Sequence, residues 1–115
     1  MAERPWPQKL VFKRGEKVLD IAFESGARFS IPFELLRVES PSAEVQGHAP
    51  HQKQLVTGKQ DVLVEAAEPV GRYAVQLKFS DGHGSGIYSW DYLHELGENA
   101  GALMDAHRKA VAARG

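Results

Sequence analysis

The stretch YAVQLKFSDGHGSGIYSWDYL, residues 73–93, holds the clearest strand of the chain, its densest glycine turn and the start of a helix. Four apolar residues alternate with small or polar ones at its beginning: Tyr73, Val75, Leu77 and Phe79. A period of two is typical of a strand with one buried side and one solvent-facing side. Asp81 and Gly82 then signal a turn, and Gly84 and Gly86 lengthen it. The stretch therefore predicts a hairpin connection of several residues, with the return strand beginning at Ile87.

Helix signals follow this hairpin. Ser89 is suited to cap the first turn of a helix. Three apolar residues then recur at spacings of three on one helix face: Trp90, Leu93 and Leu96. Gly97 is typical of the position after a helix end, so we expect this helix to end there. Asn99 is expected to cap a second helix, which would occupy the C-terminus.

The N-terminal half contains three short alternating runs, which are Lys9–Lys13, Lys17–Phe23 and Ala27–Ile31. Turn residues separate them, which predicts an antiparallel meander. Pro32–Val38 changes to a helical period, and Val62–Ala66 returns to alternation. The long segment Gly47–Lys59, with its glycines, proline and histidines, is expected to be a surface loop.

These patterns predict an α+β fold: a curved antiparallel β-sheet of about six short strands, with a helix after the glycine-rich hairpin and a C-terminal helix. We expect residues 1–8 to be a loose N-terminal arm and residues 9–97 to form the body of the domain. Residues 98–115 are expected to be the C-terminal helix, packed as part of the same domain.

Composition narrows the class of protein. A chain of 115 residues is long enough for one domain with a real core. Its net charge of −1 gives no electrostatic argument for binding nucleic acid. The chain has no cysteine, which excludes disulfides and thiolate metal sites. We find no signal peptide and no apolar run that approaches a membrane span, so we expect a cytoplasmic protein with no membrane partner.

His83 and Arg37 are the residues whose chemistry stands out. His83 lies close to Asp81 in the glycine-rich loop. It could be a ligand or an acid–base residue, or it could be a loop histidine bonded to backbone. His48 and His51 could join it to offer three imidazoles to a metal. Arg37 is expected to bind an anion or to pair with a carboxylate such as Asp81 or Glu39.

Several segments together resemble one known family. They are Leu35-Leu36-Arg37 followed by Ser40–Val45, then Val70–Val75 and Phe79–His83, and finally Gly86–Trp90 with Leu93. Over residues 9–97 the chain resembles the family of the N-terminal domain of gamma-butyrobetaine hydroxylase, which includes small stand-alone bacterial domains of unknown function. Because the resemblance is to the N-terminal domain, it does not imply the hydroxylase activity of the catalytic domain.

The resemblance also bears on a metal. In zinc-binding members of that family, three cysteines after a Leu-Arg pair and one later histidine hold the ion. The cysteine positions fall here on Ser40, Ser42 and Val45, and His83 matches the histidine. The resemblance therefore implies a member that has lost its zinc site and needs no cofactor. We expect the 40–59 segment to be held by packing and hydrogen bonds instead.

From these observations we expect a non-catalytic accessory or protein-interaction module. Related domains occur attached to iron–sulfur carrier ATPases, so the resemblance suggests an oxidoreductase or an iron–sulfur assembly component as partner. The residues that we expect at the binding surface are Arg37, Asp81, His83 and Trp90. A small metal-binding protein or enzyme using His48, His51 and His83 is the alternative, and a homodimer through strand 9–13 or the last helix is a third hypothesis.

Overall fold

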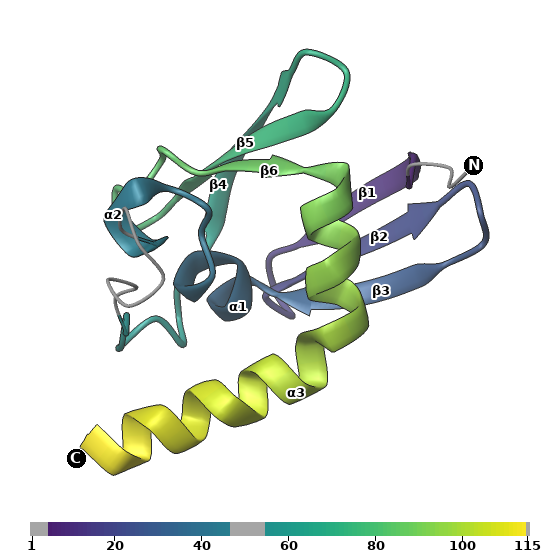
Figure 1. Cartoon of the computed structure of the whole chain (residues 1–115). Helices are drawn as coiled ribbons and strands as arrows, with labels where there is room; N and C mark the ends of the chain where they lie inside the picture. Colours follow the sequence, from purple (N-terminus) through teal and green to yellow (C-terminus); the bar gives the residue numbers. More distant parts are fainter. Residues whose placement is uncertain (1–4, 47–54, 115) are drawn as a thin grey trace.

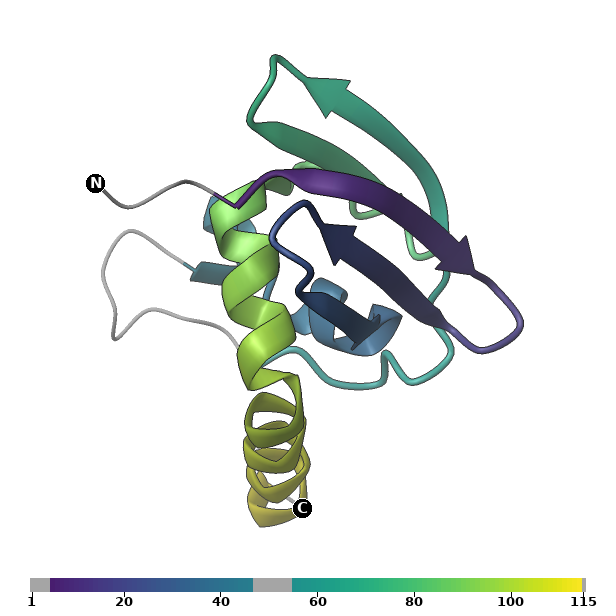
Figure 2. The same cartoon turned by 90° about the vertical axis from the view of Figure 1, so that its right-hand side faces the viewer.

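The computed structural model describes residues 5–46 and 55–114. Its elements follow in this order: β1 (Pro7–Lys13), β2 (Val18–Phe23), β3 (Arg28–Pro32), α1 (Phe33–Val38), α2 (Ala43–Gln46), β4 (Val64–Val70), β5 (Ala74–Phe79), β6 (Ile87–Ser89) and α3 (Trp90–Arg114). Figures 1 and 2 show the helix α3 running past one end of the strands and projecting beyond them at the C-terminus.

The six strands form two antiparallel sheets of three, in the orders β1-β2-β3 and β4-β5-β6. We call them the first and the second sheet. The α+β class and the antiparallel strands of the prediction are confirmed, but the strands do not join into a single sheet. Helix α1 begins directly after β3, so the chain leaves the first sheet before the second sheet starts.

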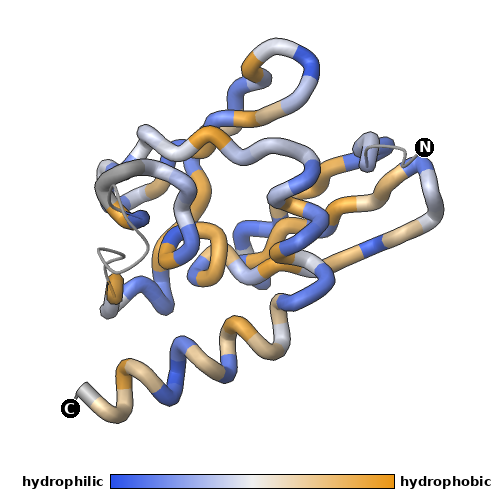
Figure 3. Tube along the Cα trace, in the orientation of Figure 1, coloured by the Kyte–Doolittle hydropathy of each residue, from blue (hydrophilic) through white to orange (hydrophobic). Residues whose placement is uncertain are grey.

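Alternation along each strand places the core between the two sheets. Leu19, Ile21 and Phe23 of β2 are almost completely buried, whereas Asp20 and Ala22 lie on the opposite side of the strand. Side chains from β3, α1, β5, β6 and the first turns of α3 complete the same core. Figure 3 shows the apolar residues concentrated where these elements meet.

Two strand boundaries differ from the prediction. β1 begins at Pro7, inside the expected loose arm, and the carbonyl oxygen of Trp6 accepts a hydrogen bond from the Glu24 N–H at 2.9 Å. β4 continues through Pro69 to Val70, beyond the end of the predicted run at Ala66. β4 is an edge strand of its sheet, so the missing N–H of Pro69 costs no ladder hydrogen bond when it faces away from β5.

The two helical segments expected on either side of Gly97 join into the single helix α3. Ser89 caps its first turn as predicted, because its hydroxyl accepts a hydrogen bond from the Tyr92 N–H at 3.0 Å. Gly97 does not end the helix. A Cβ atom at this position would lie 2.5–2.7 Å from atoms of Phe29, so this glycine lets α3 approach β3 closely. Among the described residues, no helix has the length and apolar character that a membrane span requires.

Candidate functional site

Three of the residues singled out by the sequence meet in a buried polar cluster. Nε2 of His83 lies 2.9 Å from the Ser40 hydroxyl and 3.3 Å from the Ser42 hydroxyl. The three side chains, which we call the Ser–His cluster, are almost fully buried. The cluster joins the connection between α1 and α2 to the connection between β5 and β6.

The loop after β5 positions His83 through its own backbone. Gly82 has a φ of 92°, a left-handed conformation that glycine adopts without steric cost. The turn closes with a hydrogen bond of 2.8 Å from the Phe79 N–H to the His83 carbonyl oxygen. Asp81 Oδ1 accepts a hydrogen bond of 3.1 Å from the His83 N–H, as short polar side chains often do in turns.

Gly86 allows the two loops to pack this closely. A Cβ atom here would lie 2.5 Å from the Ser40 hydroxyl oxygen and 3.1 Å from the ring of Tyr88. Any larger residue would therefore displace Ser40 from His83.

An ion cluster lies beside the Ser–His cluster. Oδ2 of Asp81 lies 2.8 Å from Nε of Arg37 and 2.6 Å from Nζ of Lys59. Burial opposes ionisation of Asp81, but hydrogen bonds from Lys59, the His83 backbone and Arg37 together hold its pKa well below the ordinary value. The predicted pairing of Arg37 with a carboxylate is confirmed. Nη1 of Arg37 is buried and has no hydrogen-bond partner among the described residues.

Two tyrosines fasten this region to the end of α1. The Tyr88 hydroxyl donates to the Leu36 carbonyl oxygen, and the Tyr92 hydroxyl donates to the Glu39 carbonyl oxygen. These are carbonyl groups that a helix end leaves without partners inside the helix. Burial raises the pKa of both tyrosines, so their hydroxyls stay protonated and available as donors.

The cluster does not form a catalytic triad. In a triad, a carboxylate orients the histidine ring and leaves the other ring nitrogen for one hydroxyl nucleophile. Here Asp81 contacts the backbone of His83, and its other oxygen is bound by Arg37 and Lys59. Two buried hydroxyls share one ring nitrogen. The arrangement supports a structural hydrogen-bond network.

A structural zinc ion does not fit this cluster either. Structural zinc takes four ligands from cysteine, histidine and carboxylate groups. The four positions at which the family resemblance implies zinc ligands hold the two hydroxyls, one imidazole and the apolar side chain of Val45, which is 2% exposed. Within residues 5–46 and 55–114, no group of three or more His, Cys, Asp or Glu residues could hold a metal. The alternative site included His48 and His51, which lie outside the described residues.

Trp90, the remaining predicted binding residue, lies in a different environment. Its indole N–H donates to the Arg72 carbonyl oxygen at 2.7 Å, and its side chain lines a small hollow with Trp6 and Tyr73. The rings of Trp6 and Tyr73 meet edge to face, with their centroids 6.2 Å apart. The structure thus brings together Arg37, Asp81 and His83 and places Trp90 among aromatic side chains.

Sequence reasoning missed Lys59, Tyr88 and Tyr92. Lys59 lies in a long segment without periodicity, so no local pattern assigns it a partner. Tyr88 falls in the predicted return strand and Tyr92 in the predicted helix. Their hydroxyls contact carbonyl groups more than fifty residues away, and such contacts leave no local signal in the sequence.

Comparisons with known proteins place this geometry in context. The model of the family described as gamma-butyrobetaine hydroxylase-like, N-terminal, matches residues 10–94. A crystal structure of a protein of unknown function from Acidithiobacillus ferrooxidans, a member of the DUF971 family, is 41% identical and superposes with a TM-score of 0.67. The match covers 78% of this chain and 90% of that one.

Two solution NMR structures are also similar. One is 42% identical, with a TM-score of 0.83 over 99% of this chain and 87% of that one. The other is 38% identical, with a TM-score of 0.81 over 96% of this chain and 86% of that one. No functionally curated relative matches.

Proposed function

Because the chain belongs to the gamma-butyrobetaine hydroxylase-like N-terminal domain family, we propose that it is a non-catalytic accessory module that binds a protein partner. The description of the family names an N-terminal domain, which supports the proposal of an accessory unit. Following the sequence resemblance, the proposed partner is an oxidoreductase or an iron–sulfur assembly component.

The observation that carries this proposal is a group of exposed aromatic side chains. Trp6 is 40% exposed and Tyr73 is 55% exposed, and both lie beside the half-buried Trp90. We call these three residues the aromatic patch. Tryptophan and tyrosine are enriched among the residues that dominate protein–protein binding energy, because they bury a large apolar area and keep a polar group for hydrogen bonding.

The four predicted binding residues then have two roles. Trp90 belongs to the aromatic patch and contacts the partner. Arg37, Asp81 and His83 use their polar atoms on one another and on neighbouring loops, so they act by holding the shape of the domain. Substitution of these three residues would weaken partner binding by loosening the fold.

A pull-down of the full chain from its own cell lysate, read by mass spectrometry, identifies the partner. Isothermal titration calorimetry with the purified partner then compares two pairs of substitutions. Trp6→Ala with Tyr73→Ala removes exposed members of the patch and should weaken binding about thirtyfold, which corresponds to about 2 kcal/mol.

The matched control is Val70→Ala with Ile87→Ala, which removes two exposed apolar side chains outside the patch. This pair should change the affinity by no more than about twofold. Equal affinity for the Trp6/Tyr73 variant and the unaltered chain would reject the patch. If only the Arg37→Ala with His83→Ala variant loses binding while it stays folded, the partner binds at Arg37 and His83 and not at the aromatic patch.

A further inference from the structure

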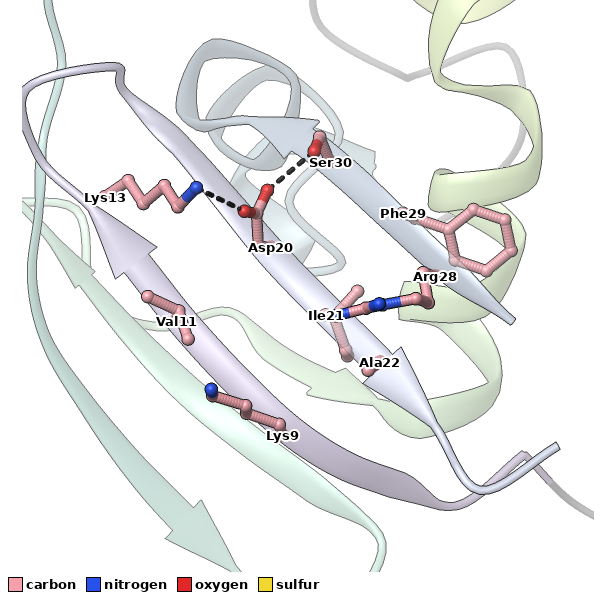
Figure 4. A pocket seen from close by; sticks show the side chains of 9 residues that line it. All are labelled: Lys9, Val11, Lys13, Asp20, Ile21, Ala22, Arg28, Phe29 and Ser30. Carbon is pink, nitrogen blue, oxygen red and sulfur yellow. Dashed lines mark hydrogen bonds and ion pairs between the residues drawn. The ribbon is translucent and has the colours of Figure 1, made fainter. Parts of the chain in front are cut away.

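The outer face of the first sheet carries a hollow of about 470 Å³, which is separate from the aromatic patch and from the Ser–His cluster. Figure 4 shows the side chains that line it, all of them from β1, β2 and β3. A hollow of this size lies within the range of small-molecule sites in proteins, about 300–1,000 Å³.

The strand register places two cations on either side of a small residue. Lys9 of β1 pairs with Ala22 of β2, and Ala22 pairs in turn with Arg28 of β3. Neighbouring strands lie about 4.8 Å apart, so the backbones at Lys9 and Arg28 are separated by roughly 10 Å. The methyl group of Ala22 leaves the space between the two long side chains open. Figure 4 shows Arg28 extending from β3 over β2.

Val11, Asp20 and Ser30 are cross-strand neighbours and form the next row of side chains on this face. The charge of Asp20 is already neutralised by its neighbours. Asp20 accepts a hydrogen bond of 2.6 Å from the Ser30 hydroxyl and pairs with Nζ of Lys13 at 2.8 Å. Arg28 adds an electrostatic attraction to Asp20, but it makes no ion pair with it. Within the part of the chain that the structure describes, neither Lys9 nor Arg28 belongs to any ion pair.

The lining therefore holds three cations and one anion, on a chain whose net charge is −1. Val11 lies in the same row as Asp20, beside the row that contains Ala22. Its side chain adds an apolar surface to the floor of the hollow. An anionic group with an apolar body attached matches both features, because the charge meets the exposed cations and the body covers the floor.

We propose that this hollow binds a small organic anion, with its phosphate or carboxylate group between Lys9 and Arg28 and its apolar part on Val11 and Ala22. The planar guanidinium of Arg28 can donate two hydrogen bonds to such a group, while Lys9 acts as a point charge. Both cations are exposed to solvent, where ion pairs contribute little individually, so the affinity lies in the high micromolar to millimolar range.

The test is an NMR titration of the ¹⁵N-labelled full chain with phenyl phosphate, benzoate and the neutral benzamide. The expected result is saturable shifts of the Val11, Ala22 and Arg28 amides with at least one anion and none with benzamide. Binding of phenyl phosphate alone assigns a phosphate ligand, and binding of benzoate alone assigns a carboxylate ligand. If neither anion shifts these amides, or if benzamide shifts them equally, the proposal is wrong.

Two variants show whether the shifts come from the proposed geometry. Lys9→Gln with Arg28→Gln should weaken binding about tenfold or more. Ala22→Leu keeps both cations but fills the space between them, and it should weaken binding to a similar extent. Arg108→Gln with Lys109→Gln removes the same charge from the far half of α3 and should leave binding unchanged. Equal loss in this control would show a general charge effect and overturn the site.

Discussion

The Ser40 hydroxyl lies 2.9 Å from Nε2 of His83, a contact between residues forty-three positions apart in the chain. It joins the segment that leaves α1 to the loop that follows β5. The family resemblance implies that zinc-binding relatives carry metal ligands at these positions. Hydrogen bonds thus hold together, in this chain, two segments that a metal would otherwise connect.

Substitution of His83 by alanine should destabilise the domain by about 1–3 kcal/mol. The change leaves two buried hydroxyls without their shared partner and opens a small cavity. Chemical denaturation measures the loss directly. The control is Ser85→Ala, an exposed serine of the same loop, which should change stability by less than about 0.5 kcal/mol. Equal midpoints for both variants would show that the cluster contributes nothing to stability.

The same geometry predicts that a metal site can be built. Ser40→Cys with Ser42→Cys and Val45→Cys would place three thiolates at the positions that the family resemblance assigns to zinc ligands, with the imidazole of His83 as the fourth ligand. We expect this triple variant to bind one zinc ion per chain, measured by elemental analysis after dialysis. Adding His83→Ala should weaken zinc binding strongly. A triple variant that folds and takes up no zinc would contradict the proposed correspondence of positions.

Asp81 makes the stability of the domain dependent on pH in acid. Its pKa is lower in the folded chain than its ordinary value of 3.8, so its contribution is present above that value. The contribution is lost as the pH falls below about 4 and the carboxylate is protonated. Asp81→Asn should therefore lower stability by about 1–2 kcal/mol at neutral pH, because Arg37 and Lys59 lose their shared counter-charge. The free energy of unfolding of this variant should also fall less steeply than that of the unaltered chain as the pH drops below about 4.

A second ion pair provides the control for Asp81. Asp61 pairs with Lys17 at 2.8 Å, but its side chain is 91% exposed. Solvent screens such a pair, so Asp61→Asn should have little effect on unfolding at any pH. If both variants follow the same pH profile, the ion cluster around Asp81 has no special role.

Local patterns predicted the strands, the Ser89 cap and the pairing of Arg37 because these depend on spacing and residue type. The division into two sheets was not predicted, because alternation shows which face of a strand is buried but not which strand lies beside it. The contacts of Lys59 and Tyr88 were not predicted for a similar reason, since their partners are distant in sequence. The hollow over Ala22 likewise depends on register, which the sequence does not state.

Gly97 and Gly101 lie in the same helix and give the clearest test of how α3 packs. In a helix interior, alanine is more favourable than glycine by about 1 kcal/mol. At Gly101 nothing lies within 4 Å of an added Cβ, so Gly101→Ala should stabilise the chain by about 0.5–1 kcal/mol. At Gly97 the added Cβ would meet the Phe29 side chain at 2.5–2.7 Å, near its attachment to the backbone, where it has little freedom to move.

Gly97→Ala should therefore destabilise by about 1–3 kcal/mol in spite of its better helix propensity. Thermal and chemical unfolding of the two single variants, with far-ultraviolet circular dichroism to confirm equal helix content, would measure these opposite effects. Stabilisation by both alanines would mean that α3 does not approach β3 as closely as described, and that Gly97 has no packing role.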